Sequence, residues 1–295
     1  MKKGFMSTTM VYSFFLLFLI MLLFIVENLV NNRTLLNNIK SEIKEDVSDS
    51  TLKRYLINHS AELGLVQLND NLVNSNFDYS YRYTGDNPSN YICFGTDDEV
   101  CSIDNLYRII GVIDGKVKII KDSSIGPIAF DETATNHFIN TSMYTYLNET
   151  FYNTFSEVWQ NKISTNTYYV NGIVLDTNNT IKDIYDLEMN NLGSTVECKI
   201  GLMYVSDYNY GSMVSNWNDY SFISNNNWLN IGIDNWLLTR NSGDNNSNYY
   251  INSSGIVSSA TVEQTYFIRP VFYLDSTISI TGGNGLETNP YRIGG

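Results

Sequence analysis

The amino-acid sequence predicts an α+β protein, with a long N-terminal transmembrane and stalk helix followed by one strand-rich head domain that contains one main helix. Three observations predict this class. Residues 5–26 form an uncharged apolar run, β-branched runs recur between 107 and 274, and apolar residues repeat at steps of three and four within 142–163. The predicted organisation is an anchor and stalk helix at 1–47, a neck at 48–79 and a head domain at 80–295.

The first predicted element is a membrane-spanning helix. Residues 5–26 carry no charge, and a helix of that length rises roughly 33 Å, enough to cross the roughly 30 Å hydrocarbon core of a bilayer. Lys2 and Lys3 precede it, so the positive-inside bias keeps the N-terminus cytoplasmic and the C-terminal domain extracellular. No small-residue cleavage pattern follows, which disfavours a cleaved secretory signal. We therefore expect a single-pass protein of the cell membrane that contacts lipid through residues 5–26.

The same segment carries a possible processing site. Lys2-Lys3-Gly4-Phe5 followed by an apolar helix resembles the leader of type IV prepilins and pseudopilins. The resemblance implies cleavage between Gly4 and Phe5 and a pilin-like structural subunit. Those families usually carry a glutamate at the fifth position after the cut, and here that position is Thr9. Because such a buried glutamate normally finds a partner in the filament, its loss removes one contact for assembly. A plain signal anchor and a pilin-like anchor both fit these residues.

Apolar periodicity continues past the membrane segment, since Leu29, Leu36 and Ile43 recur every seven residues. One continuous helix as far as Val47 would be roughly 65 Å long and would form a stalk able to self-associate. The alternative is a shorter membrane helix plus a separate amphipathic helix, because two heptads are too few for a stable coiled coil. The polar residues that follow, 48–79, are predicted to form a partly helical neck.

Charge limits the classes of partner. The formal net charge is −13, and removing the two cytoplasmic lysines makes the remainder more acidic still. Such an exterior argues against nucleic acid as a partner, because the phosphate backbone would be repelled. The length of 80–295 is ample for one compact domain with its own core.

The three cysteines predict one disulfide. Cys93 and Cys101 flank the segment FGTDDEV, a separation suited to closing a small loop in a domain placed outside the cell. Cys198 is left over, and we expect it to be a buried free thiol rather than a catalytic or metal-binding one.

Strands dominate the predicted head. Two β-branched runs at 107–121 meet at a short Asp-Gly step, which predicts a hairpin. The main helix is predicted at 142–163, with Thr141 or Ser142 as its cap and its aromatic face in the core. Further strands are predicted at 168–175, 199–206 and 266–274, the last being an edge or bulged strand because it contains Pro270.

Five motifs follow one another in a characteristic order along the head. They are DNLYRIIGVIDGKVKIIK at 104–121, IGLMYVSDYNYG at 200–211, NNWLNIGIDNWLLTRNSG at 226–243, FIRPVFYLDS at 267–276 and ITGGNGLETNPYRI at 280–293. This series resembles an uncharacterised head domain of exported Gram-positive-type bacterial surface proteins. The late WLLTR segment, the G-x-V turn and the closing R-P-V strand are also similar to C-type-lectin-like and sulfatase-modifying-factor-like domains. That second resemblance implies a loop-rich α+β scaffold that binds ligand through its long late loops.

Aromatic residues crowd the segment from 204 to 255 among many Asn, Ser and Gly. Binding loops use this mixture because Tyr and Trp give large contact areas at low entropic cost, although an AT-rich genome enriches the same residues. Trp217-Asn218-Asp219 matches the WND signature with which C-type lectins place two calcium ligands. The companion E-P-N loop and the lectin cysteine framework are absent, so a buried Trp beside a polar turn is the alternative. The predicted binding residues are Tyr208, Tyr210, Trp217, Asn218, Asp219 and Trp236, and calcium is the one cofactor left open.

No catalytic residues are predicted. The only histidines, His59 and His137, cannot form an H-E-x-x-H or similar zinc site, and no G-x-S-x-G or phosphate-binding glycine loop occurs. We therefore expect a membrane-anchored surface protein whose head binds a glycan or protein ligand in an adhesion-type role. A pilin-like structural subunit and an uncharacterised surface enzyme are the alternatives.

Overall fold

The computed structural model describes residues 21, 51–69, 79–176, 178–189, 193–217 and 223–294. The chain divides into two compact units, Met1–Ser48 and Asp49–Gly295. Apart from Met21, the predicted anchor and stalk lie outside the described residues, and so do the predicted processing residues Gly4 and Phe5.

No helix in the described residues is long and apolar enough to cross a bilayer. The longest α-helix among them, α6 (Ile181–Glu188), has eight residues, whereas a membrane span needs about 20 apolar ones. The predicted fold class, with its long transmembrane and stalk helix, is therefore wrong for the described chain. The predicted localisation, single-pass in the cell membrane with an extracellular C-terminal domain, depended on that helix and is corrected with it.

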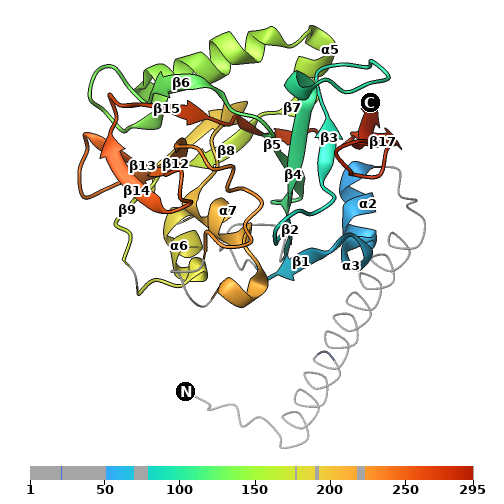
Figure 1. Ribbon diagram of the computed structural model, residues 1–295, viewed down its shortest axis with the longest axis horizontal. Helices are drawn as coiled ribbons and strands as arrows, with labels where there is room; N and C mark the ends of the chain where they lie inside the picture. Colours follow the sequence, from blue (N-terminus) through green and yellow to red (C-terminus); the bar gives the residue numbers. More distant parts are fainter. Residues whose placement is uncertain are drawn as a thin grey trace, which may run out of the picture. The chain divides into compact units, whose positions relative to one another are not determined.

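The larger sheet has eight antiparallel strands in the order β1-β2-β4-β5-β16-β11, with β3 paired to β4 and β7 to β16 (Figure 1). The hairpin predicted at 107–121 is confirmed as β4–β5, and its turn uses Asp114 and Gly115 at φ 51° and 67°. Two successive positive φ angles are what a tight hairpin turn requires. The strand bounds are β1 (Leu65–Leu68), β2 (Ser80–Tyr83), β3 (Tyr91–Cys93), β4 (Leu106–Ile113), β5 (Lys116–Lys121), β7 (Ile163–Ser164), β11 (Ile200–Gly201) and β16 (Val271–Leu274).

The second sheet has six strands in the order β14-β13-β12-β15-β6, with β9 paired in parallel to β12. Its strands are β6 (Ile125–Ala129), β9 (Gly172–Ile173), β12 (Asn235–Asn241), β13 (Ser247–Ile251), β14 (Val257–Thr261) and β15 (Thr265–Ile268). The strand predicted at 266–274 is two strands, because the chain leaves this sheet at Arg269-Pro270 and enters the larger one as β16. Two short ribbons complete the strands, β8 (Asn166–Tyr169) with β10 (Thr195–Cys198) and β17 (Ser279–Gly282) with β18 (Arg292–Gly294).

The main helix predicted at 142–163 is not continuous but is divided into short segments. Its N-cap is confirmed, since the Thr141 hydroxyl accepts a hydrogen bond from the Tyr144 amide at 3.1 Å. The chain then becomes extended at Phe155, and Ile163 already belongs to a strand. This break lets the Phe155 and Trp159 rings both pack on Phe94, with centroids 5.3 and 5.0 Å away. The segments are α4 (Ser142–Thr145), the π-helical η3 (Tyr146–Phe151), the 3₁₀ turn η4 (Tyr152–Thr154) and α5 (Glu157–Gln160).

The predicted strand at 199–206 is also mostly wrong, because only β11 forms before the chain turns into α7 (Val205–Tyr210). The Asp207 carboxylate accepts a hydrogen bond from the Tyr204 amide at 3.0 Å, which fixes the start of this helix. The remaining short helices are α2 (Leu52–Asn58), α3 (Ser60–Leu63), η1 (Ile103–Asn105), η2 (Phe138–Asn140) and η5 (Val214–Asn216).

Part of the predicted neck packs against the head. Leu52 and Leu56 of α2 are fully buried in the hydrophobic core, and the Leu52 amide donates to the Ile278 carbonyl at 2.7 Å. Strand β1 joins the larger sheet by pairing with β2. Residues 51–69 therefore belong to the same folded unit as the strands that follow.

Candidate binding pocket beside the disulfide loop

The loop that follows β3 is closed by a disulfide between Cys93 and Cys101, which confirms the predicted pair. The third cysteine, Cys198, is free and buried, also as predicted. Burial raises the pKa of the Cys198 thiol to about 12, so this thiol stays protonated and unreactive at neutral pH.

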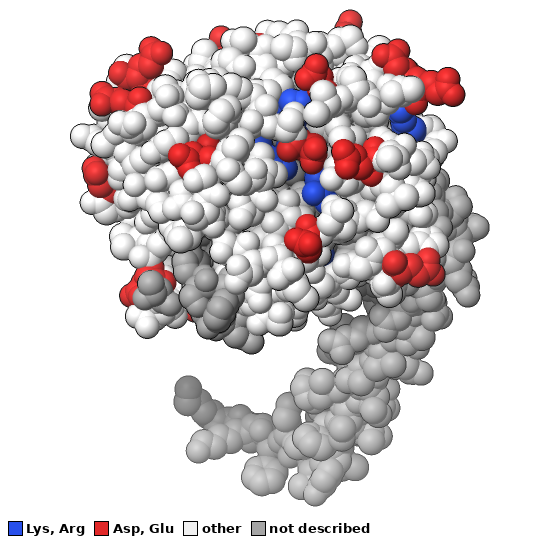
Figure 2. All heavy atoms as spheres, viewed as in Figure 1, with Lys and Arg blue, Asp and Glu red and all other residues white. Residues whose placement is uncertain are grey.

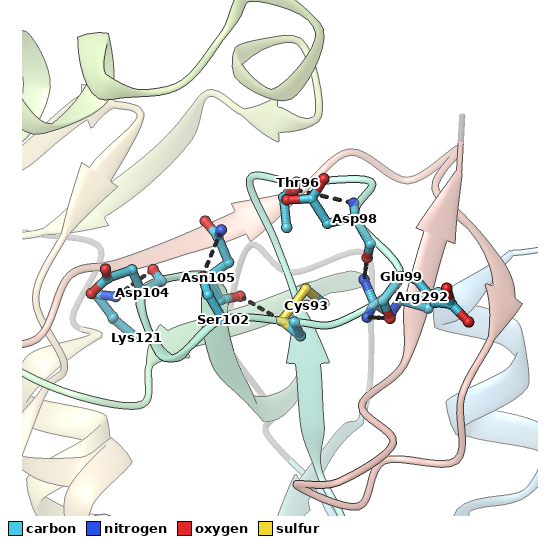
Figure 3. Close-up of a disulfide and its surroundings, with 10 residues drawn as sticks. Cys93, Thr96, Asp98, Glu99, Ser102, Asp104, Asn105, Lys121 and Arg292 are labelled. Carbon is cyan, nitrogen blue, oxygen red and sulfur yellow. Dashed lines mark hydrogen bonds between the residues drawn. A yellow bond between two sulfur atoms is a disulfide. The ribbon is translucent and has the colours of Figure 1, made fainter.

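The tip of the disulfide loop is fixed by a second contact, from Arg292 on β18 (Figure 3). The Arg292 Nη1 atom donates to the Asp98 carbonyl at 2.7 Å, and Nη2 donates to the Glu99 carbonyl at 2.6 Å. Within the loop, the Asp98 amide donates to the Thr96 hydroxyl at 3.1 Å. The loop is thus held at its base by a covalent bond and at its tip by a guanidinium group, which limits its motion before any ligand arrives.

A pocket of about 320 Å³ lies between this loop, α5 and the β17–β18 ribbon. Its volume is at the lower end of the range of about 300–1,000 Å³ that is typical of small-molecule sites. Figure 1 shows α5, β3 and β17 close to the C-terminal end of the chain. The residues that give the pocket its chemistry are Thr96, Asp97, Asp98, Glu99, Trp159 and Arg292.

Negative charge predominates at the pocket. Asp97, Asp98 and Glu99 are exposed, and no ion pair to them occurs within the described residues. Arg292 does not neutralise them by contact, because its two hydrogen bonds go to main-chain carbonyl groups. Trp159 lines the pocket but is only 4% exposed, and the Lys162 ammonium group already lies 5.4 Å from its ring centroid. The pocket therefore suits a ligand that carries positive charge and hydrogen-bond donors.

The four predicted binding residues that the structure describes do not line this pocket, and three of them are core residues. Tyr208 is fully buried and its hydroxyl donates to the Gly255 carbonyl at 2.7 Å. Trp236 is 1% exposed, and its indole nitrogen donates to the Ile128 carbonyl at 3.0 Å. Tyr210 is buried against the half-buried Trp217, with ring centroids 5.0 Å apart. The buried rings of Tyr208, Tyr210 and Trp236 therefore stabilise the fold and expose little surface to a ligand.

The two predicted calcium ligands, Asn218 and Asp219, lie outside the described residues, so calcium binding there stays a prediction. In the part of the chain that the structure describes, no group of three or more His, Cys, Asp or Glu side chains could hold a metal ion.

Residues 114–276 match the model of a family described as a domain of unknown function, DUF6273. The chain belongs to the DUF6273 family. No curated protein and no solved structure matches the chain. The DUF6273 segment contains the smaller sheet and Trp159, but the disulfide loop precedes it and Arg292 follows it. Most of the pocket is therefore built by segments that flank the DUF6273 match.

A second group of charges is buried in the core and spans the DUF6273 segment and β2. The Asp207 carboxylate accepts from Arg82 Nη1 at 2.9 Å and also contacts the Lys118 ammonium group. Burial alone would raise the pKa of Asp207, but Lys118 and Arg82 hold it below its usual range. These charges are satisfied by one another, which makes them a structural network rather than a site open to ligand.

Glu188, the last residue of α6, is buried beside that network. Its carboxylate accepts from the Val205 amide at 3.0 Å and the Ser206 amide at 3.2 Å, and it contacts the Thr239 hydroxyl. Burial raises the pKa of Glu188 to about 7, although the hydrogen bonds from Ser206 and Thr239 oppose that rise.

The pocket residues were not predicted as a site from the sequence. The two aspartates and one glutamate between Cys93 and Cys101 were a visible signal, because consecutive acids inside a closed loop must face solvent. The contribution of Arg292 was not visible, since it depends on the β17–β18 ribbon folding back beside a loop almost two hundred residues earlier.

Proposed function

We propose that the unit beginning at Asp49 is a non-catalytic binding module that holds a small cationic ligand in the pocket beside the disulfide loop. The ligand class follows from the lining, in which three exposed carboxylates lie beside a guanidinium group that is already engaged with main-chain carbonyls. An ammonium or guanidinium group of a small molecule, or a basic side chain of a peptide, would supply the complementary charge.

The observation that carries this proposal is the rigid presentation of the acidic loop. Cys93–Cys101 closes it and Arg292 holds its tip, so little conformational entropy remains to be lost when a ligand binds. Among the described residues that line the pocket there is no histidine and no free thiol, which favours binding over nucleophilic chemistry.

The test is isothermal titration calorimetry of the full chain with spermidine, arginine methyl ester and N-acetylglucosamine. We expect saturable binding of the two cationic probes, weakened by added salt, and none of the neutral sugar. The triple variant D97N/D98N/E99Q should weaken the cationic probes about tenfold or more, because each lost carboxylate removes a charge-assisted contact.

The matched control removes three carboxylates elsewhere. Glu132, Glu149 and Glu263 are exposed and do not line the pocket, so E132Q/E149Q/E263Q changes the net charge equally. Equal weakening by both triple variants would mean that only the overall charge matters, and the pocket would then not be the site. Absence of saturable binding by either cationic probe would contradict the proposed ligand class.

A further inference from the structure

Two arginine side chains are buried close to the end of the β4–β5 hairpin without a carboxylate in contact. Arg108 lies on β4 and is 5% exposed, while Arg269 lies in the crossover between β15 and β16 and is 1% exposed. Within the described residues neither guanidinium group forms an ion pair. Buried charges in proteins are normally paired, because removing an unpaired charge from water is costly.

The Arg108 guanidinium group is held rigidly. Its Nε atom donates to the Asn90 side-chain oxygen at 2.7 Å, and Nη2 donates to the Pro88 carbonyl at 3.0 Å. Its Cζ atom lies 4.3 Å from the Tyr91 ring centroid and 4.6 Å from that of Trp228. These contacts are with neutral groups, so they orient the positive charge without neutralising it.

Arg269 is bound in the same way, by neutral acceptors only. Nε donates to the Lys121 carbonyl at 2.9 Å and Nη1 to the Leu229 carbonyl at 3.0 Å. Its Nη2 atom is buried and has no hydrogen-bond partner in the described chain. A buried donor of a charged group that lacks an acceptor costs more than an ordinary unmade hydrogen bond.

The two groups are near neighbours. Arg108 contacts Trp228 while Arg269 binds the carbonyl of the next residue, Leu229. Burial, with a smaller contribution from the positive charge of Arg108, lowers the pKa of Arg269 to about 10. The Asp122 carboxylate raises the pKa values of both arginines, and Glu287 also raises that of Arg108. Asp122 is only half-buried and, within the described residues, makes no ion pair with either arginine.

We propose that Arg108 and Arg269 form a binding site for an oxyanion, such as the carboxylate, sulfate or phosphate group of a ligand. The anion would accept from Arg269 Nη2 and from Arg108 Nη1, which makes no hydrogen bond within the described residues. Figure 2 shows that carboxylates are spread over this face of the molecule and that few basic atoms reach its surface. Because Nη2 of Arg269 is covered, the anion displaces neighbouring groups as it enters, and it competes with Asp122 for the positive charge of the two arginines.

This site is distinct from the pocket beside the disulfide loop, since none of its residues lines that pocket. It also has the opposite preference, for negative rather than positive groups. Paired arginines suit planar and tetrahedral oxyanions, because their N–H donors match two oxygen atoms at once. The aromatic walls of Tyr91 and Trp228 favour a ligand whose anionic group is attached to a flat or apolar body.

The experiment titrates the full chain with sodium acetate, sulfate and phosphate against sodium chloride at constant ionic strength. The readouts are the thermal midpoint and the NMR signals of the Arg108 and Arg269 Nε–H groups. We expect a saturable rise of the midpoint with at least one oxyanion, accompanied by shifts of both arginine signals. A preference for acetate identifies a carboxylate ligand, and a preference for sulfate or phosphate identifies a tetrahedral one.

Two variants test the assignment from opposite directions. R108Q should weaken oxyanion binding about tenfold, because one charge-assisted donor is lost. D122N should strengthen it by about threefold or more, because the competing carboxylate is neutralised. K182Q, which removes an exposed lysine paired with Asp186, is the control and should leave the affinity unchanged.

The proposal is overturned if no oxyanion exceeds chloride in its effect on the midpoint and on the arginine signals. It is also overturned if D122N leaves the affinity unchanged. This second measurement does not depend on the folding of R108Q, since Asp122 is only half-buried and its substitution leaves both arginines in place.

Discussion

The carboxylates at the disulfide loop and the carboxylate of Asp207 occupy opposite environments. Asp97, Asp98 and Glu99 are exposed, and the described chain offers them no ion pair. Asp207 is 2% exposed and contacts both Lys118 and Arg82. An exposed carboxylate is stabilised by water and remains available to a ligand, whereas a buried one must be neutralised by neighbouring side chains. The same chemical group is therefore accessible from solvent in one region and part of a buried charge network in the other.

The largest expected effect is that of D207N. The substitution leaves Lys118 and Arg82 buried without their counter-charge, which should lower the free energy of unfolding by about 3–5 kcal/mol. Urea denaturation followed by circular dichroism measures the change. D186N, at the exposed pair with Lys182, is the control and should have little effect. A small loss in D207N, comparable to that of D186N, would show that the buried network does not stabilise the fold.

The second effect is a pH dependence that arises from Glu188. Its folded-state pKa, about 7, is above the ordinary glutamate value of 4.5, so the folded state binds the proton more tightly than the unfolded state. Protonated Glu188 is therefore compatible with burial at low pH, and its contribution to stability falls as pH rises from 4.5 to 7. The loss should approach about 3 kcal/mol.

The measurement compares the free energy of unfolding of the wild type and E188Q across this range. The glutamine variant cannot ionise, so the difference between the two proteins should move in its favour as pH rises. A difference that is constant from pH 4.5 to 7 would mean that Glu188 titrates normally in the folded state.

The third effect concerns the covalent closure of the pocket loop. Reduction of Cys93–Cys101, whose cysteines are 8 residues apart, should lower the free energy of unfolding by about 2–3 kcal/mol by freeing the loop in the unfolded chain. Urea denaturation with and without dithiothreitol measures it, and the variant C93S/C101S should not respond to the reagent. Binding of cationic probes should weaken in parallel, because the loop is no longer held at its base.

The smallest effect on stability is expected for substitution of the three acidic side chains in the disulfide loop. D97N/D98N/E99Q should leave the thermal midpoint almost unchanged, because exposed carboxylates without partners contribute little to folding. The same variant should lose affinity for spermidine. Thermal denaturation and calorimetry on one preparation separate the two outcomes, and a large fall of the midpoint would mean that these side chains have a structural role.

Local sequence signals predicted the features that depend on local geometry. The β4–β5 hairpin followed from its Asp-Gly turn, and the disulfide followed from the spacing of Cys93 and Cys101. The helix at 142–163 was not predicted correctly, because apolar steps of three and four also fit a series of short helical segments. The break at Phe155 lets the Phe155 and Trp159 rings both pack on Phe94. The α7 helix was missed since all of its side chains are buried, which removes the amphipathic periodicity that marks a helix.

The candidate site depended on contacts between distant segments and was largely beyond prediction. The acidic loop was visible in the sequence, but the pocket exists only because Arg292 and Trp159 reach it from β18 and α5. The aromatic residues that did look like a binding surface, Tyr208 and Trp236, satisfy their polar atoms with main-chain carbonyl groups inside the core. Composition alone could not distinguish these two uses of aromatic side chains.

The two segments that flank the family match are joined by main-chain hydrogen bonds, which has an evolutionary consequence. The Cys93 amide donates to the Tyr291 carbonyl at 3.0 Å, and the Tyr291 amide donates to the Tyr91 carbonyl at 2.9 Å. Both segments lie outside 114–276, so they can diverge together while the segment between them keeps its own packing. Exchanging both segments together should preserve these hydrogen bonds, whereas exchanging either segment alone should break them.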